Sequence, residues 1–192
     1  MDILIVGVGG QGIILASRAI GAAALAAGLP VRTAETIGMA QREGSVVSHV
    51  RLGQDGVGPL IPTGGADILL ALEPAEACRY LGYLKPGGSA LISTTPVVPV
   101  TAALGTTPYP REEILAYLQN NVAHCHLLDA PALAVQAGSH QALNMVMLGA
   151  LTGMELPFPG DTLLAAALQL LPARLHELNR RAFELGKQAL EV

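Results

Sequence analysis

The pattern of apolar and polar positions opens with the run ILIVGV at residues 3–8, which predicts a buried strand. An Ala-rich apolar stretch from Gln11 to about Ala27 follows, and it predicts a helix that ends near Gly28. Residues 29–34 predict a second strand. The beginning of the chain therefore predicts a strand–helix–strand unit with a glycine-rich turn between its first strand and its helix.

The rest of the chain continues this alternation of strands and helices. Residues 45–53 alternate apolar and polar side chains and predict a half-exposed strand, whereas the apolar run at 66–73 predicts a central one, with Pro74 opening a helix. Two further strands are predicted at 89–95 and 122–130, separated by a turn-rich connection. Helices are predicted at 111–120, 131–137, 140–152, 160–170 and 173–190. The pattern therefore predicts one α/β domain over residues 1–192, Rossmann-like and doubly wound, with a mostly parallel sheet, helices on both faces and a helical C-terminus.

The composition is apolar, with 51% hydrophobic residues, 14% charged residues and a mean hydropathy of +0.47. It suits a sheet buried on both faces, and it also suits a subunit whose surface is covered by a partner. The net charge of −4 without a basic run makes nucleic acid an unexpected partner. No basic segment precedes the first apolar run, and the apolar runs are too short and glycine-broken to span a bilayer. We therefore expect a cytoplasmic protein that does not enter membranes.

Only two cysteines occur, Cys78 and Cys125, and they belong to no C-x-x-C pair. A 4Fe-4S cluster requires about four thiolates, so this chain cannot hold one alone. We expect both cysteines to serve as small buried apolar residues.

The first candidate site is GVGGQG at residues 7–12, in which Gly7, Gly9 and Gly12 have the spacing G-x-G-x-x-G. These glycines permit a tight turn, close approach of a pyrophosphate, and close helix packing, and the helix start favours anions. Glu35 follows where a ribose-binding acid is found in dinucleotide folds. The Gln11 amide, however, is able to reach back over the loop. The residues leave three interpretations open: a strand-to-helix turn, a site for a nucleotide or CoA phosphate, and a turn that docks a protein.

The second candidate site is the polar stretch ETIGMAQREGSVVSHVR at residues 35–51. It gathers Glu35, Gln41, Arg42, Glu43, Ser45, Ser48, His49 and Arg51. Arg42 is suited to clamp a phosphate or carboxylate, and the alternative is a solvated loop whose charges pair locally. His49 and Arg51 share one strand face, which fits either a solvent-facing surface or a site.

These two stretches resemble the gamma-type domain of 2-oxoacid:ferredoxin oxidoreductases, and among them most the beta subunits of indolepyruvate ferredoxin oxidoreductases. ALNMVMLGAL at 142–151 is also similar to that family, and we expect its Asn144 amide to satisfy a backbone group. The resemblance implies an enzyme subunit that is inactive alone. Its complex would oxidatively decarboxylate a 2-oxoacid, an aryl pyruvate such as indolepyruvate, to an acyl-CoA and reduce ferredoxin.

The resemblance also implies where the cofactors lie. Thiamine diphosphate and the 4Fe-4S clusters are expected on a larger alpha subunit, which would be the partner, and ferredoxin would be reached through the complex. This chain is expected to bind no cofactor tightly and to meet CoA as a co-substrate. A homodimer is a possible form of the isolated chain.

In related enzymes the gamma-type domain covers the active-site region and helps to bind CoA. Carried onto this sequence, the candidates are Gly9, Gly10, Gln11 and Gly12 together with the 36–48 loop, which includes Gln41, Arg42 and Ser45. The family pattern H-G-M-x-Q-R-G-G is altered here, because Ile37 replaces the histidine and Glu43 the first of the paired glycines. These changes disfavour phosphate binding by the loop, or they mark a different substrate or a diverged paralogue.

Two alternative functions remain. One is a free-standing NAD(P)- or FAD-binding reductase that uses Gly7, Gly9, Gly12 and Glu35. The other is a purely structural docking subunit that contacts no ligand.

Overall fold

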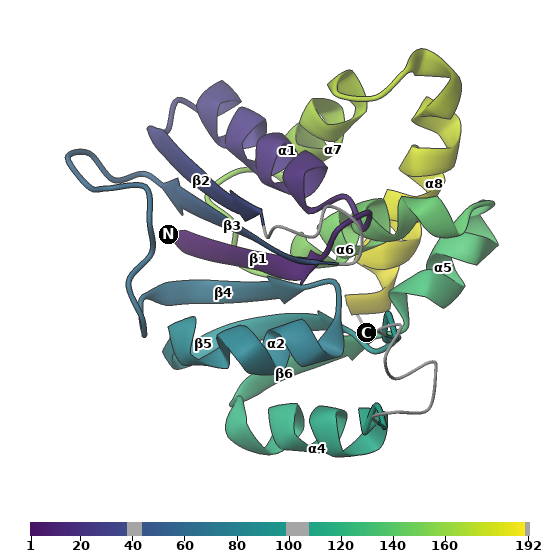
Figure 1. The fold of residues 1–192 in the computed structure, drawn as a ribbon. Coiled ribbons are helices and arrows are strands. Elements are labelled where there is room, and N and C mark those ends of the chain that lie inside the picture. The colour runs from purple at the N-terminus through teal and green to yellow at the C-terminus, as the bar shows by residue number, and fades with distance from the viewer. Residues whose placement is uncertain (38–43, 99–107, 191–192) are drawn as a thin grey trace.

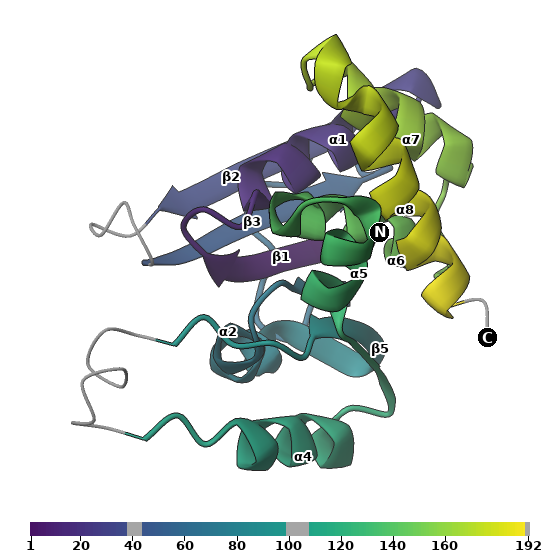
Figure 2. The same ribbon diagram turned by 90° about the vertical axis from the view of Figure 1, so that its right-hand side faces the viewer.

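A computed structural model describes residues 1–37, 44–98 and 108–190, which form a six-stranded sheet between two layers of helices (Figures 1 and 2). The strands are β1 (Asp2–Val8), β2 (Val31–Ile37), β3 (Ser45–Leu52), β4 (Ala66–Ala71), β5 (Leu84–Ser93) and β6 (His124–Leu128). The helices are α1 (Ile13–Ala26), α2 (Pro74–Tyr80), α4 (Arg111–Asn121), α5 (Ala130–Ala137), α6 (Leu143–Leu151), α7 (Gly160–Gln169) and α8 (His176–Leu190). Short 3₁₀ turns occur at Leu81–Tyr83, His140–Ala142 and Ala173–Leu175.

The strand order is β2-β3-β1-β4-β5-β6. β1, β4, β5 and β6 are parallel neighbours, whereas β3 is antiparallel to both β1 and β2. The prediction of a Rossmann-like, mostly parallel α/β sheet with a helical C-terminus is confirmed. One feature was not predicted: β3 lies between the two strands of the first strand–helix–strand unit, so β1 and β2 are not hydrogen-bonded to each other.

The prediction that residues 45–53 form a half-exposed strand is wrong. Residues 46–50 of β3 are buried, including Ser48 and His49, which are 0% and 6% exposed. Alternation of apolar and polar residues usually reports one wet face of a sheet. Here both faces are covered. The loop after β3 contacts His49 and Arg51 on one face, whereas Ser48 lies with Val46 and Val50 on the face that α1 covers.

Helices cover both faces of the sheet, as Figure 1 shows. α1, α5, α6, α7 and α8 form one layer, and α2 and α4 form the other. Alternate residues of each strand enter the two cores; Ile3 and Ile5 of β1 face the larger layer, and Leu4 and Val6 face the smaller one. The sheet is therefore buried on both sides, which accounts for the apolar composition.

α6 lies inside the larger layer, and all its residues from Asn144 to Leu151 are buried. α8 packs on α6 and α5. The α6–α8 contact is very close: a Cβ atom added to Gly149 would lie 2.7 Å from the carbonyl carbon of Phe183, and one added to Gly186 would lie 2.7 Å from that of Val146. Glycine at both positions lets the two backbones touch.

Most predicted boundaries agree with the structure to within a few residues. α1 ends at Ala26, just before Gly28, and Pro74 is the first residue of α2. The turn predicted at residues 85–88 is wrong, because these residues belong to β5, whose register against β4 shifts near its start. The loop predicted at 35–45 begins later, since β2 continues to Ile37. In the described parts of the chain, no helix is both long and apolar enough to cross a membrane.

Candidate functional site

The glycine loop lies where the carboxyl ends of β1 and β4 meet the beginning of β3. Val8, the last residue of β1, pairs with Ser45, and the amide of Leu72 after β4 donates to the carbonyl of Val6 (2.8 Å). The helices that follow β1 and β4 cover opposite faces of the sheet. The crevice between β1 and β4 is thus the switch point at which open α/β sheets bind ligands.

The side chain of Gln11 occupies this crevice. Its Oε1 accepts a hydrogen bond from the amide of Val8 (2.9 Å), and its Nε2 donates to the carbonyl of Leu72 (2.8 Å). A Cβ atom on Gly7 would lie 2.6 Å from Gln11 Oε1, so glycine is needed at position 7 to make room for the amide. Gln11 therefore joins the two strand ends, and its amide groups are already engaged.

Gly10 and Gly12 both adopt the left-handed conformation, with φ of 100° and 82°. Gly12 precedes α1, and a Cβ atom on it would lie 2.9 Å from Cγ of Asn144. The Asn144 Nδ2 donates to the Gly12 carbonyl (3.4 Å), while its Oδ1 accepts from the amide of Met145 (2.9 Å). The expectation that Asn144 satisfies backbone groups is confirmed, and α6 thereby contacts the start of α1.

A cavity of about 510 Å³ opens above this loop. Its described lining is Val8, Gly9, Gly10, Gly12, Ile13, Ile14 and Val46. The first amides of α1 have no intrahelical partners, and the helix dipole favours negative charge there. A side chain at Gly10 would meet no atom within 4 Å, so that position is open. No charged side chain lines the cavity among the described residues. The arrangement suits one end of an extended ligand with an apolar body and an anionic group.

The two sequence motifs meet at this cavity. The amide of Gly9 donates to the carbonyl of Gly44 (2.8 Å), and the neighbouring Val46 lines the cavity. The Ser45 hydroxyl points to α2 and donates to Oε2 of Glu76 (2.6 Å). The candidates Gln41 and Arg42, and the departure at Glu43, lie outside the described residues.

Glu35 is not brought to the glycine loop. It is exposed on the edge strand β2 and pairs with Ser48, which in turn pairs with Ile5. Because β3 intervenes, β2 is about 10 Å from β1, and Glu35 is level with the middle of β1. The structure therefore brings together, at the carboxyl end of β1, the candidates Gly7, Gly9, Gly10, Gln11, Gly12 and Ser45. Glu35 lies away from this group, on β2.

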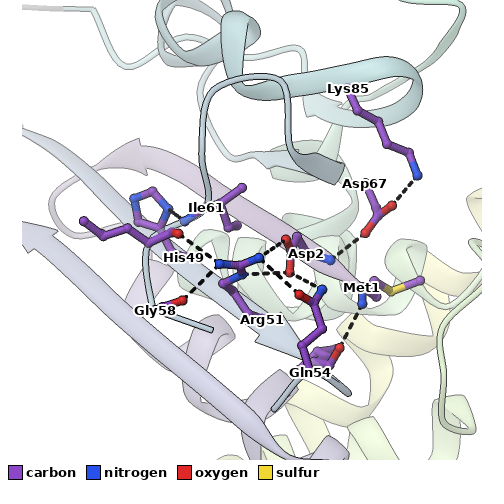
Figure 3. Close-up of polar contacts among 11 residues, drawn as sticks. Met1, Asp2, His49, Arg51, Gln54, Gly58, Ile61, Asp67 and Lys85 are labelled. Carbon is purple, nitrogen blue, oxygen red and sulfur yellow. Dashed lines mark hydrogen bonds and ion pairs between the residues drawn. The ribbon is translucent and has the colours of Figure 1, made fainter. Parts of the chain in front are cut away.

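The second half of the 35–51 motif lies at the opposite edge of the sheet, as Figure 3 shows. Arg51 forms an ion pair with Asp2 (3.0 Å) and donates to the carbonyls of Gly58 (3.0 Å) and Leu60 (3.2 Å). His49 Nδ1 accepts from the amide of Ile61 (3.1 Å). Burial, and secondly the charge of Arg51, lower the pKa of His49. These two side chains hold the loop after β3 against the sheet.

Sequence reasoning missed two buried carboxylates at the start of α2, Glu73 and Glu76, which are 2% and 6% exposed. The Tyr109 hydroxyl donates to Glu73 Oε1 (2.5 Å). A signal was present in the sequence LEPAE, where an acid follows a buried strand and precedes a helix-opening proline.

The cysteines lie in the smaller helical layer, Cys78 on α2 and Cys125 on β6, and both are partly buried. Burial raises the pKa of both thiols, and the charge of Glu73 adds to the effect at Cys78. Two thiols do not fit a 4Fe-4S cluster. Within the described ranges, no three His, Cys, Asp or Glu side chains group to hold a metal ion.

Comparison of the sequence and the fold with known proteins shows which family the chain belongs to. The family model described as pyruvate ferredoxin/flavodoxin oxidoreductase matches residues 2–189, and the chain belongs to that family. This match and the solved gamma subunit described below together confirm the gamma-type resemblance.

Individual proteins within this family are similar to the chain over nearly its full length. The chain is 40% identical over 191 residues to the indolepyruvate oxidoreductase subunit IorB of Pyrococcus horikoshii, covering 98% of this chain and 95% of the relative. It is 42% identical over 188 residues to IorB of Archaeoglobus fulgidus, covering 97% and 93%. Among solved structures, the gamma subunit of a keto/oxoacid ferredoxin oxidoreductase from Geobacter sulfurreducens superposes with a TM-score of 0.73 at 26% identity, covering 99% of this chain and 98% of that one.

Proposed function

We propose that this chain is the non-cluster subunit of a 2-oxoacid:ferredoxin oxidoreductase that acts on indolepyruvate or a related aryl pyruvate. The observation that carries the proposal is the near-complete match to IorB subunits at about 40% identity. The structure supports it because the two family motifs, which are separate in the sequence, come together at one cavity through Gly9 and Gly44.

The chain's own contribution is to bind and orient CoA. The glycine loop offers a backbone surface that a phosphate or pantetheine group can approach without side chains in the way. Two side chains hold the loop conformation by hydrogen bonds to backbone groups. Gln11 bonds to Val8 and Leu72, and Asn144 bonds to Gly12. The cavity itself supplies no described cation, so Arg42 and the partner are the proposed sources of positive charge.

The chemistry that changes the substrate belongs to the partner. The 4Fe-4S clusters are assigned to a larger alpha subunit because this chain has two cysteines and a cluster requires about four thiolates. Thiamine diphosphate is assigned to the same subunit because the family resemblance implies it. When bound there, these groups supply decarboxylation and electron transfer to ferredoxin. This chain would complete the pocket over them and exclude water from the CoA-dependent step.

The test is to co-express the chain with a candidate thiamine-bearing subunit from the same genome and to purify the complex. We expect viologen reduction that requires both CoA and an aryl pyruvate, and neither subunit alone should be active. Arg42→Ala should raise the KM for CoA several-fold and leave the KM for the 2-oxoacid unchanged. Failure of the two chains to assemble, or reduction that does not require CoA, would contradict the proposal.

The same preparation separates the two alternatives. If Arg42→Ala leaves both CoA affinity and turnover unchanged, the chain acts as a docking subunit. Calorimetric titration of the isolated chain with NAD⁺, NADP⁺ or FAD examines the reductase alternative. The position of Glu35, two strands away from β1, leads us to expect no dinucleotide binding.

A further inference from the structure

The first turn of α2 holds residues from two distant parts of the chain. The Ser45 hydroxyl donates to Oε2 of Glu76 (2.6 Å), and the Tyr109 hydroxyl donates to Oε1 of Glu73 (2.5 Å). The amide of Ala75 donates in turn to the Tyr109 oxygen (3.2 Å). A strand that begins at Ser45 and a segment that leads into α4 are therefore attached to the same helical turn.

Burying these carboxylates is costly unless every oxygen finds a donor. All four oxygens do. Glu73 Oε2 accepts from the amide of Glu76 (2.9 Å), which caps the helix, and Glu76 Oε1 accepts from Arg79 (3.2 Å). The cap requires only one oxygen of Glu73. The bonds to Ser45 and Tyr109 go beyond what is needed to begin a helix, and both point away from α2.

Glu73 and Tyr109 hold the turn itself in place. Burial first, and then the hydrogen bond to Glu73 and its charge, raise the pKa of Tyr109 far above the physiological range. Tyr109 therefore stays protonated and keeps donating to Glu73. The bond between Tyr109 and Glu73 therefore holds the first turn of α2 in place, and with it the Glu76 carboxylate that accepts from Ser45.

The bond from Ser45 leads directly to the glycine loop. Ser45 follows Gly44, whose carbonyl accepts from Gly9, and precedes Val46, which lines the cavity. The connection from Glu76 to the loop thus consists of one side-chain bond, one peptide link and one backbone bond. A shift of Ser45 would move the Gly44 carbonyl away from Gly9 and change the cavity.

We propose that Glu76 is a positioning residue for CoA binding: through Ser45 and Gly44 it sets the glycine loop and the start of β3 in the geometry that the ligand meets. On this inference the Ser45 hydroxyl serves Glu76 and not the ligand. The inference rests on the proposed function, because it concerns the same cavity.

The experiment uses the assembled complex with Glu76→Ala, Ser45→Ala, their double variant and Glu76→Gln. Loss of one hydrogen bond corresponds to about a five-fold effect. We expect each alanine variant to raise the KM for CoA about five-fold, with kcat and the KM for the 2-oxoacid nearly unchanged. The double variant should lose less than the sum of the two single variants, because the Ser45–Glu76 bond is counted in both. Ser45→Ala additionally removes the contact between the Ser45 and Tyr80 hydroxyls (3.3 Å), and Glu76→Ala the bond from Arg79 (3.2 Å). Glu76→Gln should restore the KM, because its amide oxygen still accepts from Ser45.

Glu112→Ala is the matched control, because Glu112 is an acid in the first turn of another helix, α4, with its side chain 83% exposed. It should change nothing. A KM for CoA that rises equally in this control, or that Glu76→Gln fails to restore, would overturn the positioning role.

Hydrogen exchange by mass spectrometry distinguishes this failure from failure of the proposed function. Peptides covering residues 7–12 and 44–48 should exchange faster in Glu76→Ala and Ser45→Ala than in wild type, without CoA present. Unchanged exchange would refute the positioning role. Faster exchange with an unchanged KM for CoA would uphold the coupling from Glu76 to the loop and reject CoA as the ligand.

Discussion

The contact between Gly12 and Asn144 gives the sharpest prediction, because Gly10 provides an internal control. Both glycines have positive φ, at 82° and 100°, so alanine is strained at either position. Only at Gly12 does the new Cβ also collide, since it would lie 2.9 Å from Asn144 Cγ, whereas at Gly10 it would meet no atom within 4 Å. The main difference between the two substitutions is therefore the collision.

The magnitudes follow from these two costs. The left-handed conformation costs about 1–2 kcal/mol for alanine, and the loss of unfolded-state freedom returns about 0.4–1 kcal/mol. Gly10→Ala should thus destabilise by about 1 kcal/mol. Overpacking against Asn144 adds about 1–3 kcal/mol, so Gly12→Ala should destabilise by about 2–4 kcal/mol. For a chain of this size that lowers Tm by roughly 5–15 °C, against roughly 2–4 °C for Gly10→Ala.

The assay is urea or thermal unfolding followed by circular dichroism on the four proteins of a cycle: wild type, Gly12→Ala, Asn144→Ala and the double variant. Asn144→Ala alone loses its backbone bonds, at about 1–3 kcal/mol. In the double variant the collision disappears, so its destabilisation should fall short of the sum by at least about 1 kcal/mol. Additive values, or equal losses for Gly10→Ala and Gly12→Ala, would show that Asn144 does not restrict position 12.

Three further predictions concern the scaffold. Gly149→Ala should lower Tm by roughly 5 °C or more, because its Cβ would overlap the backbone of α8. The control Gly21→Ala should be neutral or slightly stabilising, because the nearest atom to its Cβ would be 3.5 Å away. Equal Tm values for the two variants would refute the close helix contact. Cys78 and Cys125 should react with a thiol reagent at pH 7 far more slowly than free cysteine, because burial raises both pKa values; fast labelling in the native protein would contradict this. The pKa of His49 is lower in the folded protein than in the unfolded chain, so as the pH falls the unfolded chain takes up the proton first. The free energy of unfolding should therefore decline as the pH falls below about 6.5. His49→Asn should flatten that part of the pH–stability curve, and an unchanged slope would count against His49.

Several site residues were predictable because their chemistry is local. The glycine spacing at 7–12 reports a strand-to-helix turn, and Gly12 and Gly10 do adopt the backbone conformations that favour glycine. The predicted reach of the Gln11 amide back over its own loop is also local, and it is present. Glu35 was predicted from its place at the end of the second strand, where dinucleotide folds have a ribose-binding acid. Insertion of β3 between β1 and β2 moves it away from the glycine loop.

The Glu73 and Glu76 contacts could not be found in this way. A carboxylate beside Pro74 predicts a helix cap, and Glu73 is one, but its second oxygen serves Tyr109, 36 positions further along the chain. Ser45 was named as a site residue from its motif, yet its hydroxyl is directed to Glu76 on another element. Hydrogen bonds between distant segments leave no periodic signal in the sequence.

By itself the sequence determined the α/β class, the helices and most strands, the glycine turn and the family, because periodicity and backbone preference act over a few residues and the two motifs are specific. The tertiary structure alone decided that β3 runs antiparallel between β1 and β2. β3 runs the full length of β1, from Ser45 opposite Val8 to Arg51 opposite Asp2. It therefore places the first half of the second motif at the glycine loop and the second half, with Arg51, at the other end of the strands. Strand order depends on which faces bury the most apolar surface together, and that is a property of the assembled sheet.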